Sequence, residues 1–514
     1  MRLKAKIREA IKRRKRRLAK RLNKQDCSGS ERPMMTASNV HYEVAERTRA
    51  TAAGGIVAFH LLAKKLGLDQ AIDRGLVLLK MHLPYHESDH VLNIAYNLLA
   101  GGSCLEHLEY LRSDEAYLDA LGARRIPDPT TAGDFCRRFN DCHIIGLMEV
   151  FNATRLTVWR QQPKAFFRQA IIEADGTIVA TTGECKQGMD ISYNGQWGYH
   201  PLILSLANTG EVLYVVNRSG NRPSHEHAAM YFDRAVGLCR KAGFRKILLR
   251  GDTDFTQTAY LDRWDDAGDV QFIFGIDAMP NLYEIVEKLP KNAWKELKRP
   301  AKYEVKTQPR QRPENVKEKI VQEREFQNIR LVKEYVAEFT YQPAKCRKAY
   351  RVVVVWKDLE VNQGQKKLFD KDRCFFYITN DWATPAEEIV FSANDRCNQE
   401  NLIQQHKGGV RSLVAPVDNL LSNWAYMVMA SLAWSLKAWS ALVLPEDGRW
   451  SAKHREEKHK LLRMDFATFR RAMVQVPAQV LRTGGKIVCR LLAWNPWQHV
   501  FFRLLDQLAK PLRC

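Results

Sequence analysis

An ordered series of apolar runs in the middle of the chain constrains its fold more than any other feature of the sequence. Four short runs have the length and composition of buried strands: 170–172, 202–206, 212–216 and 247–249. An amphipathic segment at about 225–242 separates the last two runs, and a second helix and a fifth strand are expected at about 256–266 and 270–276. Asn208-Thr209-Gly210 suits a hairpin turn. The stretch therefore predicts a mixed α/β fold in the order strand, strand, strand, helix, strand, helix, strand.

Two aspartates stand at strand ends of this predicted sheet. Asp175 follows the first run, and Asp252 lies just past the fourth. Strand ends hold side chains at fixed positions on a rigid sheet, so two carboxylates there can share a divalent cation. Mg²⁺ prefers such oxygen ligands, and a two-metal site with ions about 3.5–4 Å apart suits attack on a phosphodiester. Asp175 is equally compatible with an ordinary turn, since turns favour Asp beside Gly.

The charge balance points to a polyanionic partner. The 514 residues include 80 Lys and Arg against 58 Asp and Glu, a formal charge of +22. Nucleic acid is the first expectation and an anionic membrane surface the second. The 11 cysteines contain no CxxC pair, which favours reduced thiols in a cytosolic protein. The apolar stretch 424–436 is shorter than the roughly 20 residues a membrane span needs, so we expect a buried helix there.

Composition and periodicity divide the chain into six expected segments. A basic tail comes first, with 13 basic side chains in residues 1–24 that suit contacts to DNA phosphates or a solvated end. Met34-Met35 offers an alternative start, which leaves the expression of residues 1–33 open. The expected segments are a basic tail and linker (1–39), a helical, DNA-binding region (40–165), a first core part (166–289), a β-rich insertion (290–373), a second core part (374–445) and a helical C-terminal region (446–514).

A later segment, 385–407, is expected to be a helix that carries Arg396, Glu400 and Lys407. Spacings of four and seven residues correspond to one and two turns, which would place the three side chains on one face. An ordinary charged helix face has the same spacing, so the pattern alone does not establish a site.

Taken together, Asp175, Asp252 and the Arg396–Glu400–Lys407 pattern resemble the DDE transposases of bacterial insertion sequences, specifically the thirteen-eighty branch of the insertion-sequence-four superfamily. The likeness extends over roughly residues 40 to 500 and includes several further segments: Asp175-Gly176-Thr177, Gly198-Tyr199-His200-Pro201-Leu202, Arg250-Gly251-Asp252, Thr379-Asn380 and 401–409. Two departures stand out. Ala393 occupies the place of the motif's tyrosine, and Asp254 follows Asp252 where the family has glycine, so Asp254 competes for the ligand role. Glu173 is a similar neighbour of Asp175, expected on the same strand face.

The resemblance implies an RNase H-like catalytic core interrupted by the β-rich insertion. It implies that Asp175, Asp252 and Glu400 are catalytic and bind two Mg²⁺ ions, with Mn²⁺ as a substitute, and that Arg396 and Lys407 contact DNA. The expected activity is cleavage at the ends of an insertion sequence and strand transfer into target DNA, by cut-and-paste transposition. The implied partners are double-stranded DNA, with its terminal inverted repeats, and a second copy of the chain on paired ends. The implied location is bacterial, cytoplasmic and nucleoid-associated, with no membrane partner.

Two other functions fit the same residues. An RNase H-like nuclease or resolvase would cut without joining. A catalytically silent DNA-binding protein derived from a transposase would bind without cutting, although three intact carboxylates argue against it.

Overall fold

The computed structural model describes residues 2–23, 35, 37–82, 84–299, 316–324, 327–363 and 366–512. The chain forms two compact units, of which one is inserted into the other. The first unit comprises residues 1–162 and 405–514, and the second comprises residues 163–404. The charged, proline-containing segment 290–325 is expected from the sequence to be an extended excursion, and its residues 300–315 and 325 lie outside the described residues. The six-part division of the chain stays a prediction.

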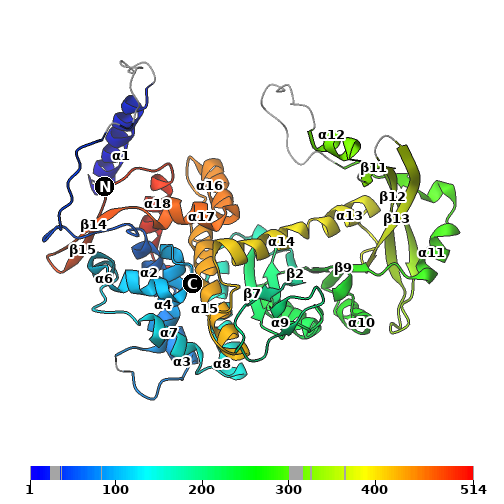
Figure 1. The fold of residues 1–514 in the computed structure, drawn as a ribbon, viewed down its shortest axis with the longest axis horizontal. Helices are drawn as coiled ribbons and strands as arrows, with labels where there is room; N and C mark the ends of the chain where they lie inside the picture. Colours follow the sequence, from blue (N-terminus) through cyan, green and yellow to red (C-terminus); the bar gives the residue numbers. More distant parts are fainter. Residues whose placement is uncertain are drawn as a thin grey trace. The chain divides into compact units, whose positions relative to one another are not determined.

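A nine-stranded mixed sheet forms the centre of the second unit (Figure 1). In spatial order its strands are β10 (Lys295–Glu296), β11 (Gln327–Tyr341), β12 (Tyr350–Gln363), β13 (Lys366–Thr379), β9 (Val270–Ile276), β8 (Ile247–Gly251), β2 (Ala170–Gly176), β6 (Leu202–Leu206) and β7 (Glu211–Val216). Strands β2, β8 and β9 run parallel, and the other pairings are antiparallel. The predicted mixed α/β class and the predicted order of elements between residues 170 and 276 are confirmed.

Helices cover both faces of this sheet. On one face, Phe232 of α9 (Ala228–Ala242) packs edge to ring with Trp264 of α10 (Thr258–Asp266) and with Phe274 of β9, and the Trp264 ring is tilted against Phe274. On the other face, Leu248 and Ile273 cluster with the apolar side chains of α13 (Ala386–Asn394). Because side chains alternate along a strand, the residues that share a face with Leu248 and Ile171 point toward α13. Glu173, Asp175 and Arg250 belong to this set.

The β-rich insertion extends the central sheet directly, because β13 pairs with β9 of the core. The sequence predicts four strands here, at 329–332, 335–341, 350–356 and 374–378, and the first two are one long strand, β11, with a bulge between Leu331 and Lys333. The second unit also contains short elements that were not predicted from the sequence. They are η3 (Lys164–Arg168), the small sheet β3 (Val179–Ala180), β5 (Trp197–Tyr199) and β4 (Asp190–Ile191), η4 (Thr253–Phe255), α11 (Pro280–Glu287), η5 (Lys291–Ala293) and α12 (Val316–Glu323).

The first unit is mainly helical. Its elements are α1 (Arg2–Arg21), β1 (Ala50–Thr51), α2 (Ile56–Lys65), α3 (Leu68–Gly75), α4 (Glu87–Ala100), η2 (Leu105–His107), α5 (Leu108–Arg112), α6 (Glu115–Leu121), α7 (Pro129–Cys136), α8 (Asp141–Trp159), η6 (Gln405–Gly409), α15 (Leu420–Leu442), α16 (Ser451–Arg463), α17 (Phe466–Phe469), η7 (Arg470–Val474), β14 (Ala478–Thr483), β15 (Lys486–Leu491) and α18 (Gln498–Leu508). Helix α15 is buried along nearly its whole length and contacts α2, α4, α7, α8 and α16. The buried helix expected around residues 424–436 is thus confirmed. None of the described helices is long and apolar enough to cross a membrane.

The sequence also predicts a helical segment over 466–491 that is interrupted at 474–482 near Pro477, and this prediction is wrong for the residues after 474. After α17 and a π-helical turn, the chain forms the hairpin β14–β15, which also pairs with β1. Gly484 and Gly485 form its two-residue turn, with φ angles of +54° and +70°. Two consecutive glycines with positive φ are the requirement of a type I′ hairpin turn, so this signal was present in the sequence.

Candidate active site

Asp175 lies one residue before the end of β2, on the face that carries α13. The sequence analysis placed it after the strand, whereas the strand continues to Gly176 and pairs Asp175 with Ile203 of β6. Burial raises the pKa of Asp175 to about 7, and the negative charge of Asp252 adds to the shift. A carboxylate that is hard to ionise beside a second carboxylate is typical of a cation-binding or catalytic site.

Asp252 follows β8 directly and caps the short helix η4. Its Oδ1 accepts a hydrogen bond of 3.1 Å from the backbone amide of Asp254. Burial is the main reason why the pKa of Asp252 is raised. The Asp254 side chain is exposed. Asp252 therefore holds the position nearer the sheet, and Asp254 contributes its amide.

Glu400 lies in the first turn of α14 (Cys397–Gln404), and Arg396 precedes that helix. The helix expected over 385–407 is present as α13, α14 and the start of η6, but its α-helical hydrogen bonding is interrupted at Asp395 and Arg396. Here the amides of Asn398 and Gln399 bond carbonyls three residues earlier, those of Asp395 and Arg396. Asn394 and Asp395 are poor formers of helix interiors because their side chains compete for backbone groups, which agrees with a break at this place.

The guanidinium of Arg396 lies close to all three carboxylates. Its Nη1 lies 3.7 Å from Oδ2 of Asp175 and 3.5 Å from Oδ2 of Asp252, and its Nη2 lies 3.6 Å from Oε1 of Glu400. The carboxylates come from β2, from the end of β8 and from α14, which are distant in sequence. Their shared contact with one cation shows that they face a common space.

These carboxylates fit a divalent metal in chemistry, although the guanidinium now lies among them. Three carboxylates provide the hard oxygen donors that Mg²⁺ and Mn²⁺ accept. Within the described residues, no group of three or more His, Cys, Asp or Glu side chains is close enough to form a metal site. Metal binding by Asp175, Asp252 and Glu400 would therefore require Arg396 to turn away and the carboxylates to close in.

Glu173 does not share the contact with Arg396. It is fully buried and pairs with Arg250, with 2.5 Å between its Oε1 and the Nη2 of Arg250. Burial raises the pKa of Glu173, and Arg250 opposes that shift. The sequence analysis identified Glu173 but missed Arg250, although a charged residue inside a run of buried strand residues was a visible signal.

Lys407 lies in the π-helical turn η6, which belongs to the first unit. The preceding His406 is buried, and its Nδ1 lies 2.7 Å from the hydroxyl of Ser412. Burial lowers the pKa of His406 to about 3, so this imidazole is neutral.

A cavity of about 490 Å³ adjoins the carboxylates in the second unit. It is lined by Asp252 and Arg396 and by Ala393, the residue at the position of the motif's tyrosine. Aromatic side chains form much of its remaining wall: Tyr283, Phe375, Phe376 and Tyr377. The absence of a large side chain at 393 leaves this space open beside the acidic site.

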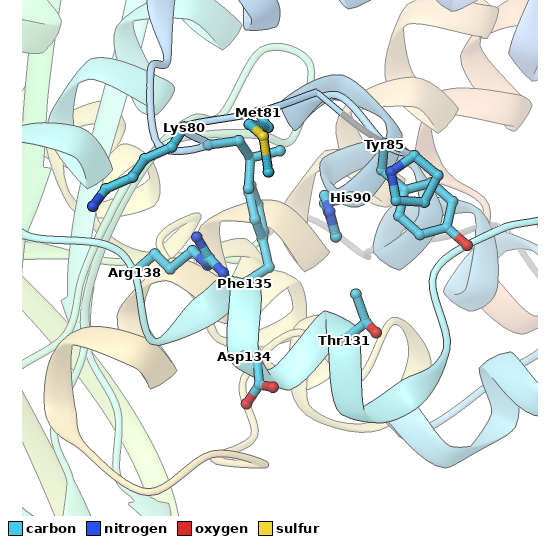
Figure 2. A pocket seen from close by; sticks show the side chains of 10 residues that line it. Lys80, Met81, Tyr85, His90, Thr131, Asp134, Phe135 and Arg138 are labelled. Carbon is cyan, nitrogen blue, oxygen red and sulfur yellow. The ribbon is translucent and has the colours of Figure 1, made fainter.

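A second cavity, of about 430 Å³, lies in the first unit (Figure 2). The imidazole of His90 stacks on the ring of Phe135, with 4.3 Å between their centroids, and burial lowers its pKa to about 4. Asp134 also lines this cavity, and it forms an ion pair of 2.8 Å with Arg137. With one carboxylate that is already paired, the cavity lacks the acidic character of the site at Asp175.

The fold and this site define a mixed α/β protein in which three carboxylates converge at the carboxyl ends of two interior strands of the central sheet. Comparison with known families gives the family: residues 37–512 match the model described as transposase DDE domain group 1. The chain belongs to this family. The activity that the family implies is that of a transposase, an enzyme that generally uses divalent metal ions.

Comparisons with individual proteins add little. No curated protein matches the chain. Among solved structures, the chain is similar to the piggyBac transposase in a cryo-EM structure of its synaptic complex with hairpin DNA. The identity is 9%, the TM-score is 0.35, and the alignment covers 83% of this chain and 84% of that one. A likeness this low does not establish a shared fold.

Proposed function

We propose that the chain is a DNA transposase of a bacterial insertion sequence that cuts DNA at the ends of its element and joins them to target DNA. The observation that carries this proposal is the convergence of Asp175, Asp252 and Glu400 on one guanidinium. Family membership supports it independently. We assign the chain to the thirteen-eighty branch of the insertion-sequence-four superfamily on the motif residues described above.

The strand order supports an RNase H-like core for this reaction. Strands β7, β6, β2, β8 and β9 are neighbours in that order, with β6 antiparallel to β2 and β8 parallel to it. In chain order this is an antiparallel meander of three strands followed by two parallel strands with intervening helices. Asp175 near the end of β2 and Asp252 directly after β8 then belong to neighbouring strands, where their carboxylates can act together.

In the proposed mechanism, Asp175, Asp252 and Glu400 hold two Mg²⁺ ions, which Mn²⁺ can replace. When bound, such ions activate the attacking oxygen and stabilise the leaving oxygen of an in-line displacement. Asp175 must release its proton to act as a ligand, because its pKa is about 7. Arg396 leaves the carboxylates and binds a DNA phosphate, for which its planar guanidinium is suited. Lys407 provides a second phosphate contact as a point charge.

The partners in this proposal are double-stranded DNA and a second copy of the chain. The net charge of +22 favours binding to the phosphate backbone. Two ends of one element must be cut together, so we propose a homodimer on paired ends. The proposed location is the bacterial cytoplasm, at the nucleoid.

A reconstituted reaction tests the proposal. Purified protein, Mg²⁺ and DNA carrying the repeats that flank its gene should give cleavage at the element ends and joining to a target duplex. Asp252→Ala and Glu400→Gln should reduce both to background. Two matched controls, Asp254→Asn and Glu388→Gln on α13, should retain activity, since neither carboxylate contacts Arg396.

The same reaction separates the rival functions. Cleavage without joining would support a nuclease or resolvase. DNA binding without cleavage, unchanged by Asp252→Ala and Glu400→Gln, would mean that the carboxylates are structural and that the chain is a silent DNA-binding protein.

A further inference from the structure

A buried ion pair lies directly beneath the three carboxylates. Glu173 of β2 and Arg250 of β8 are register partners on adjacent parallel strands. Their side chains are only 1% and 4% exposed, and Arg250 Nη2 donates to Glu173 Oε1 over 2.5 Å. The other arm of the same guanidinium reaches α13, where Nη1 donates to the carbonyl of Ser392 over 2.6 Å and lies 3.4 Å from its hydroxyl.

This pair connects β2 and β8, which lead to Asp175 and Asp252, with α13, which leads to Arg396. Glu173 precedes Asp175 by two residues on the same strand face, and Arg250 precedes Asp252 by two. Ser392 precedes Arg396 by one helical turn. One guanidinium thus fixes β2 to β8 and both strands to the end of α13, so a shift of any segment would change the distances among the carboxylates.

Stability alone is a weak reason for such a pair. Burial of two charges removes their hydration, and replacement of a buried ion pair by apolar side chains of similar volume is often neutral or stabilising. Arg250 also holds its Nε buried without a hydrogen-bond partner in the part of the chain that the structure describes. A group that is expensive to bury and incompletely paired, yet connects its own strand by hydrogen bonds to β2 and α13, fits a geometric role better than a purely stabilising one.

We propose that Glu173 and Arg250 are positioning residues that set the separation of Asp175, Asp252 and Arg396, and so the metal affinity of the site. Neither residue touches metal or DNA in this role, because both side chains are enclosed by the sheet and α13. The proposal rests on the proposed function, since it assumes that the carboxylates bind divalent ions.

Replacement of the pair by apolar residues separates positioning from stability. Glu173→Leu/Arg250→Met should fold with a melting temperature close to that of the wild-type protein. Its Mn²⁺ affinity, measured on DNA-free protein by electron paramagnetic resonance, should fall about 10- to 100-fold, as expected when groups that orient metal ligands are removed. Cleavage should fall with it through kcat, while KM for DNA stays unchanged. The single variant Arg250→Lys should have a Mn²⁺ affinity between those of the wild-type protein and the double variant. Lysine keeps the positive charge but can reach only one of the two partners, Glu173 and Ser392.

A second ion pair in the same sheet provides the matched control. Arg351 of β12 pairs with Glu338 of β11 and also donates to the carbonyls of Asp381 and Thr384, so it too connects strands to a following loop. Glu338→Leu/Arg351→Met should leave the Mn²⁺ affinity unchanged. Equal effects of the two double variants on Mn²⁺ affinity would overturn the proposal.

The outcomes also distinguish this inference from the proposed function. If wild-type protein binds Mn²⁺ and Asp252→Ala abolishes binding while Glu173→Leu/Arg250→Met retains full affinity and kcat, the positioning role is wrong and the proposed site stands. If Asp252→Ala binds Mn²⁺ and cleaves DNA as the wild-type protein does, the proposed function itself fails. If the apolar double variant unfolds, the near-isosteric Glu173→Gln takes its place with the same readouts.

Discussion

Asp175 is the residue whose ionisation should control the site. Burial and the neighbouring Asp252 raise its pKa from 3.8 to about 7. The folded protein therefore holds a proton on Asp175 over a pH range in which the unfolded chain has released it. Because the folded state binds more protons there, the free energy of unfolding should fall as pH rises from 3.8 to about 7. Above that pH the contribution of Asp175 should stay constant at its lower value. Glu173 and Asp252 have pKa values shifted in the same direction.

Asp175→Asn should flatten this pH dependence in the presence of a chelator. Thermal unfolding between about pH 5 and 8 measures it, with Asp254→Asn as the control that keeps the wild-type slope. Added Mg²⁺ should restore stability to the wild-type protein above about pH 7, where Asp175 is ionised. A wild-type protein whose stability is flat across this range would contradict the assignment.

If the three carboxylates bind metal as proposed, Arg396 should compete with the metal for the same oxygens. Its guanidinium lies within 3.7 Å of an oxygen of each of Asp175, Asp252 and Glu400. Arg396→Gln should therefore raise the affinity of DNA-free protein for Mn²⁺ severalfold, when measured above about pH 8 so that removal of the cation does not simply protonate Asp175. The same variant should cleave DNA more slowly, because it lacks the phosphate contact. A lower Mn²⁺ affinity in this variant would show that Arg396 orients the carboxylates and does not compete.

At the scale of elements, the buried helix α15 contains a lysine whose effect on the stability of the protein should depend measurably on pH. Lys437 is 1% exposed, its Nζ donates to the carbonyl of Leu462 over 2.9 Å, and it lies 3.7 Å from the centre of the Trp434 ring. Burial lowers its pKa from 10.5 to about 7. Between these values the unfolded chain binds more protons, so this group should make the protein more stable as pH rises from about 7 to 10.5. Lys437→Met should remove that rise in melting temperature, whereas the exposed Lys510→Met should keep it.

The sequence predicted elements where local pattern and tertiary environment agree. The runs at 202–206 and 270–276 match β6 and β9 residue for residue, because buried strands need continuous apolar residues. Strand ends and a motif marked Asp175, Asp252 and Glu400 in the sequence, and the structure brings all three close to Arg396, while their catalytic role stays a prediction. The interruption at Asp395–Arg396 was missed, because the regular spacing of Arg396, Glu400 and Lys407 predicts one helix across it. The Glu173–Arg250 pair was missed because strand order, which no local pattern encodes, brings these two residues together.

For the whole molecule, the surplus of positive charge should govern DNA affinity, and α1 concentrates much of it. Arg14 of α1 donates to the carbonyls of Leu491 and Ala493 over 2.9 and 3.3 Å, while most other described side chains of the helix are exposed. Deletion of residues 1–24 should weaken binding of specific and random duplexes alike. It should also lower the slope of log Kd against log salt by about 0.9 for each phosphate that these residues neutralise in the wild-type complex. An unchanged slope would show that α1 does not bind DNA.

The insertion of one unit into the other has a genetic consequence. Residues 405–514 complete the first unit, and they include α15, which lies at its centre. A stop codon or frameshift between residues 163 and 404 removes Glu400 or the residues that directly follow it. The truncated chain also lacks α15, so the helices encoded before the lesion lose this packing partner. We expect the resulting fragments to be unfolded and degraded, so they cannot occupy DNA ends in competition with the intact product. Nonsense alleles across this interval should therefore be recessive, and interfering alleles should arise only from substitutions that leave the reading frame intact.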